Sequence, residues 1–485
     1  MRIAMVASEC EPFAKTGGLA DVVDALSRSL GRRGHEVDVF LPRYRAIDPP
    51  DWAAAQRLDV PVATAPPVAG ARPVAGRPPT TEVIVWTIEE ADRRVRLVDH
   101  PASFDRPGHY GEGGDYEDNG ARFSLFGRAV LASLDLDHQR PDVLHGHDWQ
   151  SGPTLMWAAA RDDAAGQTAQ SPSRVLTCHN LAYHGWLPAD RAWQVGLPAP
   201  AGRREGIDLL SEGIATAGLV NTVSPTFARE SLTRQYGGGL HEALRALGDR
   251  YVGILNGIDT VLWDPATDEA LAANYGRSDR DGKETCRADL CARHGLDPSG
   301  PIFGMVGRLD PQKGFDLVAA AAHQLIAMGG RLIVLGTGDA SLLADLRATG
   351  QAAPDRVAVI DRFDRDEARR IYAGADIFLM PSRFEPSGQG QLIALRYGTA
   401  PLVRRTGGLA DTVRDVDEHP ATGNGFCFDA AEPTELVAAA RRAVAALASA
   451  PRWATLVERG MAEDHSWDAP AAEYEAAYER AIALR

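Results

Sequence analysis

Lysine is almost absent from this sequence. Lys15, Lys283 and Lys313 are the only lysines, and arginine supplies the rest of the 51 basic residues. Against 66 acidic residues this gives a formal net charge of -15, which argues against a general nucleic-acid or acidic-membrane surface and leaves room only for a local basic cleft. Lys15 and Lys313 stand beside glycines at expected strand-to-helix turns, where a compact ammonium next to backbone N–H groups suits a phosphate. Lys283 is expected at the surface.

Cysteine is also scarce, and long apolar runs are missing. The five cysteines show no CxxC spacing and no paired framework, which predicts reduced thiols. Glu9 and Glu11 interrupt the first apolar run and no basic segment precedes it, so we expect no signal peptide. No stretch reaches the ~20 apolar residues of a membrane-spanning helix. The sequence therefore predicts a soluble, cytoplasmic α/β protein of roughly two to four domains.

What is present is a glycine turn that occurs twice. An apolar run at residues 3–7 leads through KTGGLAD at 15–21 into an amphipathic helical pattern and a second apolar run at 37–41. This order of strand, glycine turn, helix and strand predicts the first βαβ unit of a doubly wound sheet. The hexapeptide TGGLAD returns at residues 406–411. Either each half of the chain brings a glycine turn to a shared ligand site, or both are ordinary turns of a repeated fold.

Four later apolar runs end in polar residues, near positions 147, 179, 224 and 256. Ligands of open parallel sheets bind beyond the carboxyl ends of the strands, so we expect these ends to line one crevice. They carry Asp148, His179 and Asn256, which are hydrogen-bonding groups suited to sugar hydroxyls. Residues 61–80 and 161–174 are expected as loops.

A second α/β series follows the segment around Trp263 and Pro265. We therefore predict two Rossmann-like, doubly wound domains, at residues 1–263 and 264–465, that face a central cleft. Residues 466–485 are predicted to form a C-terminal helix that packs back on the first domain, with Trp467, Tyr474 and Tyr478 as packing residues.

The second half brings two cations, Arg308 and Lys313, to one glycine-containing turn, GRLDPQKG. Cations and backbone amides together stabilise the charge that builds on a departing nucleoside diphosphate. A further turn, GTGD with Gly338, lacks the third glycine of a dinucleotide fingerprint. The DxD pairs of the sequence have no clear setting at a strand end, so a metal-free sugar-nucleotide transferase fits these features best.

The stretch EPSGQGQ, which begins at Glu385, opens a predicted helix. Its Ser387, Gly388 and Gly390 present backbone N–H groups that suit a diphosphate. Glu385 would repel phosphate and is expected to accept hydrogen bonds from a sugar hydroxyl; the alternative is a helix cap.

These motifs together resemble one family over essentially the whole chain. KTGGLADVV at Lys15, YEDNGARF at Tyr116, HGHDW at His145, TCHNLAYHG at Thr177 and NTVSPTFARE at Asn221 are followed by GILNGID, GRLDPQKG, GTGD and VRRTGGLADTV. They occur in the order found in the bacterial glycogen synthases and plant starch synthases, which have the GT-B architecture. The resemblance implies transfer of glucose from ADP-glucose to the non-reducing 4-OH of an α-1,4-glucan, with retention and without a metal cofactor.

The resemblance also implies roles for individual residues. Asp148, His179 and Asn256 would surround the reacting centre, and Asp21 and Tyr116 would lie towards the acceptor. Glu385 would bind the transferred glucose. Donor binding would fall to Lys15, Gly17, Gly18, Arg308, Lys313, Gly338, Glu385, Ser387, Gly388 and Gly390, of which Arg308, Lys313 and Glu385 also count as catalytic.

Two departures from the family pattern concern this site. The family usually has EPCGLTQ where this chain has EPSGQGQ, and Ser211 stands where a lysine is often found. The alternatives left open are transfer from UDP-glucose or to another acceptor, a nucleotide-dependent oxidoreductase, and a catalytically silent glucan-binding protein. No full GxGxxG with an acidic residue about twenty positions later supports the oxidoreductase. The catalytically silent alternative is disfavoured by the presence of Lys15, Arg308, Lys313 and Glu385.

Overall fold

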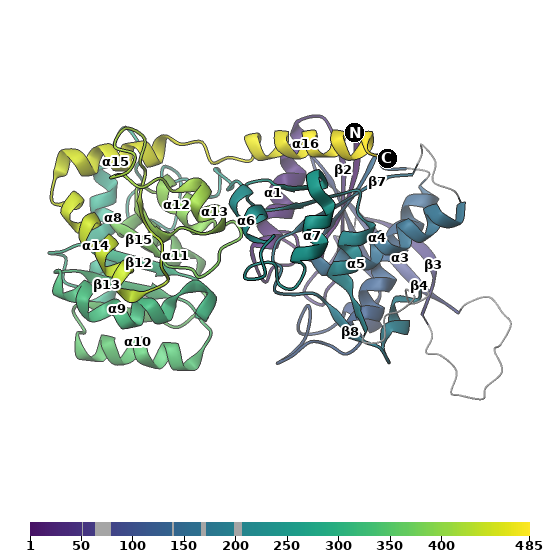
Figure 1. Ribbon diagram of the computed structural model, residues 1–485, viewed down its shortest axis with the longest axis horizontal. Coiled ribbons are helices and arrows are strands. Elements are labelled where there is room, and N and C mark those ends of the chain that lie inside the picture. Colours follow the sequence, from purple (N-terminus) through teal and green to yellow (C-terminus); the bar gives the residue numbers. More distant parts are fainter. Residues whose placement is uncertain (51, 64–78, 138–139, 166–170, 198–205) are drawn as a thin grey trace. The chain divides into compact units, whose positions relative to one another are not determined.

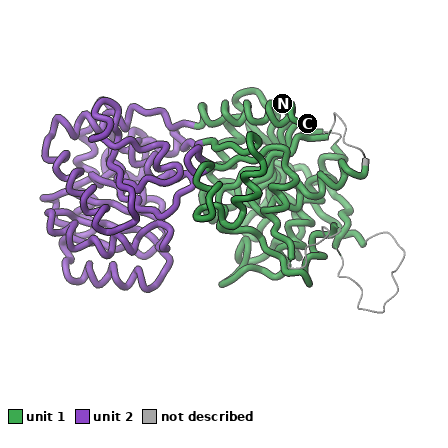
Figure 2. Tube along the Cα trace, viewed as in Figure 1, with its two compact units in different colours: residues 1–223, 228–254, 467–485 green, residues 224–227, 255–466 purple. Residues whose placement is uncertain are grey.

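The computed structural model describes residues 1–485 except 51, 64–78, 138–139, 166–170 and 198–205. The chain divides into two compact units (Figure 2). Unit 1 comprises Met1–Val223, Ala228–Ile254 and Trp467–Arg485, and unit 2 comprises Ser224–Phe227 and Leu255–Ser466. Each unit is an α/β sandwich around its own sheet (Figure 1), as the sequence predicts.

Unit 1 is built on a nine-stranded sheet in the order β11-β10-β7-β6-β1-β2-β5-β4-β3. The strands from β11 to β5 pair in parallel, and β4 and β3 add antiparallel at one edge. The inner parallel strands are almost wholly buried, as expected where helices cover both faces of a sheet. The strands are β1 (Arg2–Val6), β2 (Glu36–Pro42), β3 (Ala54–Pro61), β4 (Thr80–Glu89), β5 (Arg94–Asp99), β6 (Val143–His147), β7 (Ser173–Cys178), β10 (Leu219–Thr222) and β11 (Tyr251–Gly253), with β8 (Trp186–Pro188) and β9 (Gly206–Asp208) in a separate two-stranded sheet.

The helices of unit 1 follow the predicted apolar patterns. In α1 the buried positions include Leu19, Val22, Val23, Leu26 and Leu30, which lie on one helical face. The helices are α1 (Gly18–Arg32), α2 (Pro101–Phe104), α3 (Asn119–Leu136), α4 (Asp148–Ala165), α5 (Leu209–Thr216), α7 (His241–Leu247) and α16 (Asp468–Ala483), with 3-10 turns η1 (Ala192–Val195) and η2 (Gly248–Arg250).

The two loops expected from the sequence are described only at their ends. β3 ends at Pro61 and β4 begins at Thr80, and the expected loop between them lies mostly outside the described residues. α4 extends to Ala165, so the first part of the expected loop at 161–174 is helical and residues 166–170 are not described.

Unit 2 has a fully parallel six-stranded sheet in the order β14-β13-β12-β15-β16-β17. The strands are β12 (Ile302–Val306), β13 (Arg331–Leu335), β14 (Val357–Ile360), β15 (Ile377–Met380), β16 (Ala400–Arg404) and β17 (Phe426–Phe428). The covering elements are α8 (Asp281–His294), η3 (Pro311–Lys313), α9 (Phe315–Ala327), α10 (Ala340–Ala352), α11 (Arg365–Gly374), α12 (Gly390–Arg396), α13 (Gly407–Thr412), α14 (Pro433–Leu447) and α15 (Ala450–Ala462).

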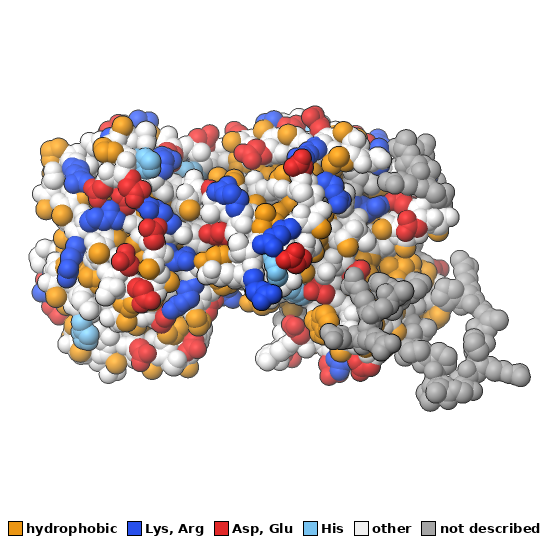
Figure 3. All heavy atoms as spheres, viewed as in Figure 1, with side chains coloured by type: hydrophobic (Ala, Val, Ile, Leu, Met, Phe, Trp, Pro, Cys, Tyr) orange, Lys and Arg blue, Asp and Glu red, His pale blue; other side chains and the backbone are white. Residues whose placement is uncertain are grey.

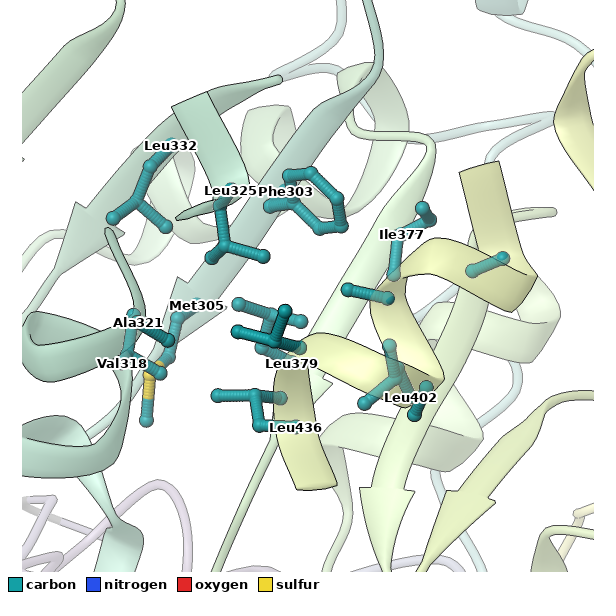
Figure 4. Close-up of a cluster of buried hydrophobic side chains, with 14 of the residues drawn as sticks. Phe303, Met305, Val318, Ala321, Leu325, Leu332, Ile377, Leu379, Leu402 and Leu436 are labelled. Atoms are coloured by element: carbon teal, nitrogen blue, oxygen red, sulfur yellow. The ribbon is translucent and has the colours of Figure 1, made fainter. Parts of the chain in front are cut away.

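One face of this sheet packs its apolar side chains against α9 and α14. Phe303 and Leu379 from the central strands meet Val318, Leu325 and Leu436 from these helices (Figure 4). Burial of such side chains stabilises the unit by about 1.5–3 kcal/mol each. The core fixes the central strands, whose carboxyl ends carry the candidate site.

Each sheet contains a point where the strand order reverses. In unit 2 the chain runs from β12 outwards to β14 and then returns to the other side of β12 with β15, which is the Rossmann order. In unit 1 the corresponding point lies between β1 and β6. Loops that leave the carboxyl ends of two such strands diverge and open a crevice for a ligand. The residues after β12, β15, β1 and β6 are therefore the first place to look for a site.

The unit boundaries differ from those expected from the sequence. Residues 255–263 belong to unit 2, where Ile258 N–H donates to the carbonyl of His465 over 2.8 Å. Ser224–Phe227 also belong to unit 2, because Thr226 donates from its backbone N–H and its hydroxyl to Asp411. α6 (Pro225–Glu230) thus contains one of the crossings between the units.

The C-terminal helix α16 belongs to unit 1 and lies beside α1 (Figure 1). Asn221 Nδ2 donates to the Tyr474 hydroxyl over 3.1 Å, and the Tyr478 hydroxyl lies 2.8 Å from His145 Nδ1. Both tyrosine side chains are fully buried. The last helix is therefore bonded to the strands that carry polar site residues.

Lys283 is not the surface lysine expected from the sequence. Its ammonium donates to the carbonyls of Ala373 and Tyr397 and to the Thr399 hydroxyl over 2.8–3.1 Å. Burial lowers the pKa of Lys283 to about 8. The lysine ties α8 to the ends of α11 and α12.

Acidic and basic side chains are interspersed over the face shown in Figure 3. Among the helices of the described residues, none combines the length and apolar character needed to cross a membrane.

Candidate functional site

In unit 2 the turns that follow β12 and β15 are bonded to each other. Arg383 N–H donates to the Gln312 carbonyl over 2.8 Å, and Gln312 Nε2 donates to the Phe384 carbonyl over 3.3 Å. Gly314 adopts φ +75°, and a Cβ there would lie 2.4 Å from the Pro381 carbonyl oxygen, so only glycine allows this approach. The two turns form one rigid platform at the reversal point of the sheet.

Lys313 and Glu385 meet on this platform. Lys313 Nζ donates to Glu385 Oε2 over 2.6 Å, and the Ser382 hydroxyl donates to the same oxygen over 3.1 Å. The Glu385 residue is only 5% exposed, whereas the Arg308 side chain, on the same turn as Lys313, is 58% exposed and lies 3.3 Å from Asp310 Oδ2. A buried carboxylate thus orients one cation, while a second cation faces solvent.

The glycine-rich stretch after Glu385 is closed by Gln391. Gln391 Nε2 donates to the carbonyls of Ser387 and Gly388, over 3.1 and 3.2 Å, and the Ser387 hydroxyl points to the Gly388 carbonyl. A Cβ at Gly390 would lie 3.0 Å from the Phe378 ring, so a larger residue at this departure from the family pattern would require the aromatic core beneath to shift slightly. α12 is short and its first turn packs on this core.

Gly338 lies at the carboxyl end of the neighbouring strand β13. It is exposed, and a Cβ there would lie 2.3 Å from the Leu309 carbonyl oxygen. The GTGD turn is therefore pressed against the turn that carries Arg308.

The repeated hexapeptide has two different environments. In the second copy, Gly407 and Gly408 are buried, and a Cβ at either would lie 2.0 Å from a carbonyl oxygen of Glu385 or Ser387. In the first copy, no described atom lies within 4 Å of a Cβ built on Gly17 or Gly18. The second turn therefore packs beneath the Glu385 stretch, and only the first turn is open to a ligand.

The open turn is held by carboxylates. Lys15 Nζ donates to Asp21 Oδ1 over 2.5 Å and lies 3.1 Å from Glu11 Oε1. Glu9 Oε2 accepts from the backbone N–H groups of Thr16 and Gly17 over 2.5 and 3.1 Å. Two of the amides that were expected to face a phosphate are thus bonded to a side chain of the protein.

Glu9 was not predicted as a site residue. It is 3% exposed and also accepts hydrogen bonds from the hydroxyls of Thr16 and Tyr110, each over 2.5 Å. It therefore joins the Lys15 turn to the glycine-rich segment around Tyr110. Its place two residues after a buried apolar run was the signal available in the sequence.

Asp148 and His179 lie next to each other at the ends of β6 and β7. Asp148 Oδ1 accepts from the backbone N–H of His179 over 2.7 Å, and Asp148 has φ +54°. Burial raises the pKa of Asp148 to about 7 and lowers the pKa of His179 to about 3. His179 is accordingly a neutral imidazole near pH 7.

The two other predicted residues have separate surroundings. The guanidinium groups of Arg106 and Arg122 lie over the Tyr116 ring, 4.9 and 5.2 Å from its centroid, and the Tyr116 hydroxyl accepts from Gly108 N–H. Asn256 is 7% exposed and belongs to unit 2, unlike Asp148 and His179. Its Oδ1 has no hydrogen-bond partner among the described residues.

Asp148 gives a prediction on pH and stability. Its folded pKa of about 7 lies above the ordinary value, so its contribution to stability is full below about pH 4 and is lost as the pH rises to 7. Asp148→Asn removes this titration and keeps a side chain that tolerates φ +54°. At pH 8 we expect the free energy of unfolding of the variant to exceed that of the wild type by about 2–4 kcal/mol. This difference should shrink towards pH 4.

Urea unfolding at several pH values measures this difference. Asp163→Asn, at an exposed position of α4, is the matched control and should run parallel to the wild type. Parallel curves for Asp148→Asn and wild type would show that Asp148 titrates normally.

Comparison with known proteins identifies the family. Residues 2–246 match the model of the starch synthase catalytic domain, and residues 287–453 match that of glycosyl transferases group 1. A glycogen synthase of Anaeromyxobacter dehalogenans is 44% identical and one of Syntrophotalea carbinolica 40% identical, each over 98% or more of both chains.

Two solved structures are similar to this chain over nearly its full length. The catalytic domain of starch synthase IV from Arabidopsis thaliana, bound to ADP and acarbose, superposes with a TM-score of 0.86 at 32% identity and covers 99% of each chain. A sucrose-phosphate synthase from Thermosynechococcus elongatus shares the fold, with a TM-score of 0.60 at 19% identity over 100% of both chains. The chain is a glycosyltransferase of GT-B architecture and belongs to the family of bacterial glycogen synthases and starch synthases.

Proposed function

We propose that this enzyme transfers glucose from ADP-glucose to the non-reducing 4-OH of an α-1,4-glucan, with retention of the anomeric configuration. The observation that carries the proposal is the Lys313–Glu385 pair, beside the exposed Arg308, at the reversal point of the unit 2 sheet. Relatives that are named glycogen synthases, and a starch synthase bound to ADP and acarbose, support this donor and acceptor.

The two cations act on the leaving group. As the bond between glucose and diphosphate breaks, negative charge builds on the departing ADP. Lys313 has three N–H donors and uses one for Glu385, so the others serve phosphate oxygens. Arg308 approaches the same phosphates from the solvent side. Gly338, Ser387, Gly388 and Gly390 line the donor, because their turns surround this platform.

Glu385 acts on the sugar. Its carboxylate receives Lys313 and the Ser382 hydroxyl on one oxygen, and its other oxygen accepts from a glucose hydroxyl. This bond fixes the anomeric carbon relative to the cations. Because Lys313 and the Ser382 hydroxyl orient the carboxylate, Glu385 serves as a positioned acceptor of hydrogen bonds.

An exposed aromatic residue offers a place for the nucleobase. Phe363 follows β14, whose carboxyl end lies beside that of β13, where Gly338 is found. The residue is 78% exposed, which is unusual for phenylalanine. Stacking on such a side chain would stabilise a bound adenine ring.

The remaining predicted residues belong to unit 1, apart from Asn256, which belongs to unit 2. His179, oriented by Asp148, and Asn256 of unit 2 bond to hydroxyls near the reacting centre. Lys15 and Gly18 contact the donor at the open turn. Gly17, whose N–H is bonded to Glu9, allows the donor to approach closely because it has no side chain. Asp21 and Tyr116 serve the acceptor side.

The proposed transfer is metal-independent, because two cations of the chain lie at the candidate donor site. Arg308 and Lys313 supply the positive charge that a metal would otherwise bring.

The five thiols, all buried and unpaired, fit action in the cytoplasm.

A radiolabel transfer assay with glycogen as primer tests the proposal. We expect label from ADP-glucose to enter glycogen at an unchanged rate in EDTA, with at most slow transfer from UDP-glucose. Preference for UDP-glucose would overturn the choice of donor and would connect the altered stretch from Ser387 to Gly390 with it. Glucan binding without transfer from either donor would establish the silent-binder alternative.

A further inference from the structure

A second histidine is hydrogen-bonded to His179. We propose that His147 is a positioning residue that holds His179 in the tautomer with its proton on Nδ1, so that His179 donates a hydrogen bond to a sugar hydroxyl. The proposal rests on the function above, in which His179 contacts the sugar, and it concerns a side chain that itself touches no substrate.

His147 is placed by the sheet. It is the last residue of β6, pairs in register with Thr177 of β7, and is fully buried. Its Nδ1 lies 3.0 Å from His179 Nε2, and the two rings are stacked with centroids 5.3 Å apart. In a hydrogen bond between two neutral imidazole rings, one ring donates its N–H and the other accepts.

The third histidine of the cluster has its tautomer fixed by its neighbours. The Thr177 hydroxyl donates to Asn221 Oδ1 over 2.7 Å, so it accepts from His145 Nε2–H, also over 2.7 Å. His145 Nδ1 then accepts from the Tyr478 hydroxyl of α16. The His145 ring is locked from both sides, and it packs on His147 with centroids 4.1 Å apart.

The surroundings of Nε2, the second ring nitrogen of His147, indicate which ring donates in the hydrogen bond between His147 and His179. His147 Nε2 is buried and has no partner among the described residues. If Nε2 carried the proton, a buried N–H donor would be left unpaired, and such donors are rarer than unpaired acceptors. His147 therefore carries its proton on Nδ1, and this N–H donates a hydrogen bond to His179 Nε2.

The consequence falls on His179. Its Nε2 is an acceptor, so the proton of this neutral imidazole is on Nδ1. Asp148 holds the backbone of the same residue through His179 N–H. His179 thus has both its main chain and its ring fixed before any sugar binds, and its free nitrogen is a donor.

Two variants of His147 separate positioning from packing. His147→Asn places an amide N–H close to the position of Nδ1, whereas His147→Leu fills the space without a donor. We expect the leucine variant to lower kcat by about 10–100-fold with little change in KM for ADP-glucose. The asparagine variant should recover most of this loss, and thermal melting should show both variants folded.

A double-mutant cycle tests whether His147 acts through His179. In a His179→Ala background, His147→Leu should cost no further activity, because the group that it positions is gone. An equal loss in both backgrounds, or an asparagine variant no better than leucine, would assign His147 a purely structural role.

The tautomer can be read without any activity. Proton–nitrogen correlation spectra of histidine-labelled wild-type enzyme, with His179→Ala to assign the signal, should show a protonated Nδ1 and a bare Nε2 for His179. The opposite pattern would overturn the proposal even if the transferase reaction is as described. A correct tautomer in an enzyme that transfers no glucose would instead refute the proposed function.

Discussion

Lys313→Met is expected to lower kcat for glucose transfer from ADP-glucose by about 10²–10³-fold. The ammonium is held 2.6 Å from Glu385 at the reversal point of the sheet, where we propose that the diphosphate leaves. A donor placed where charge develops is worth more in the transition state than in the ground state, so the loss should appear in kcat more than in KM. Steady-state kinetics with glycogen as acceptor measures the effect.

The control removes a cation elsewhere in unit 2. Arg347 pairs with Asp361 at the surface over 2.9 Å, and Arg347→Met should leave kcat within about twofold of the wild type. If Lys313→Met retains more than a third of the wild-type kcat while Arg308→Ala does the same, leaving-group stabilisation by this platform is ruled out.

Glu385→Gln is expected to have an effect of similar size, about 10²–10³-fold in kcat. The substitution keeps the shape of the side chain but removes the negative charge that holds Lys313, and it replaces one of the two acceptor oxygens by an NH2 donor. The side chain can then no longer accept from Lys313 on one oxygen and from the proposed sugar hydroxyl on the other. Because ADP carries no glucose, its Kd should change only a few-fold. Calorimetric titration with ADP measures this Kd and transfer kinetics measures kcat, so the two effects can be separated.

The matched control is Glu458→Gln, whose carboxylate pairs with Arg277 at the surface. It should behave as wild type in both assays. The double variant Lys313→Met/Glu385→Gln should lose about as much activity as the worse single variant, because the two side chains act as a unit. Losses that multiply would mean that they act independently.

The site of unit 2 could be predicted from the sequence in part. Apolar runs that end in GRLDPQKG and EPSGQGQ placed Lys313 and Glu385 at carboxyl ends of strands, and both lie there. Their contact depends on β15 lying beside β12, although two strands separate them in the chain. Strand order is set by the packing of the whole sheet and has no local signal.

The repeated TGGLAD shows the limit of a local motif. Six identical residues form an open turn at Gly17 and a buried one at Gly407. The difference comes from Glu385 and Ser387, whose backbone covers the second copy. Lys283 was mistaken for a surface residue for the same reason, since its acceptors come from segments about 90 residues or more further along the chain.

The site of unit 1 was predicted less completely. Asp148 and His179 were predicted as candidate residues because they follow apolar runs, whereas Glu9 and His147 were not predicted. Both lie within or next to a strand, where a polar residue is ordinarily a satisfied core residue. Only the bonds to Thr16, Gly17 and His179 reveal what they hold.

Proton NMR of the reaction mixture tests the central claim most directly. The wild-type enzyme is mixed with ADP-glucose and maltotriose in EDTA, and the anomeric signals are followed from the first minutes. The account predicts release of ADP together with a new α-1,4 anomeric signal. A β-linked product would contradict retention, and free glucose without chain growth would contradict transfer to a glucan.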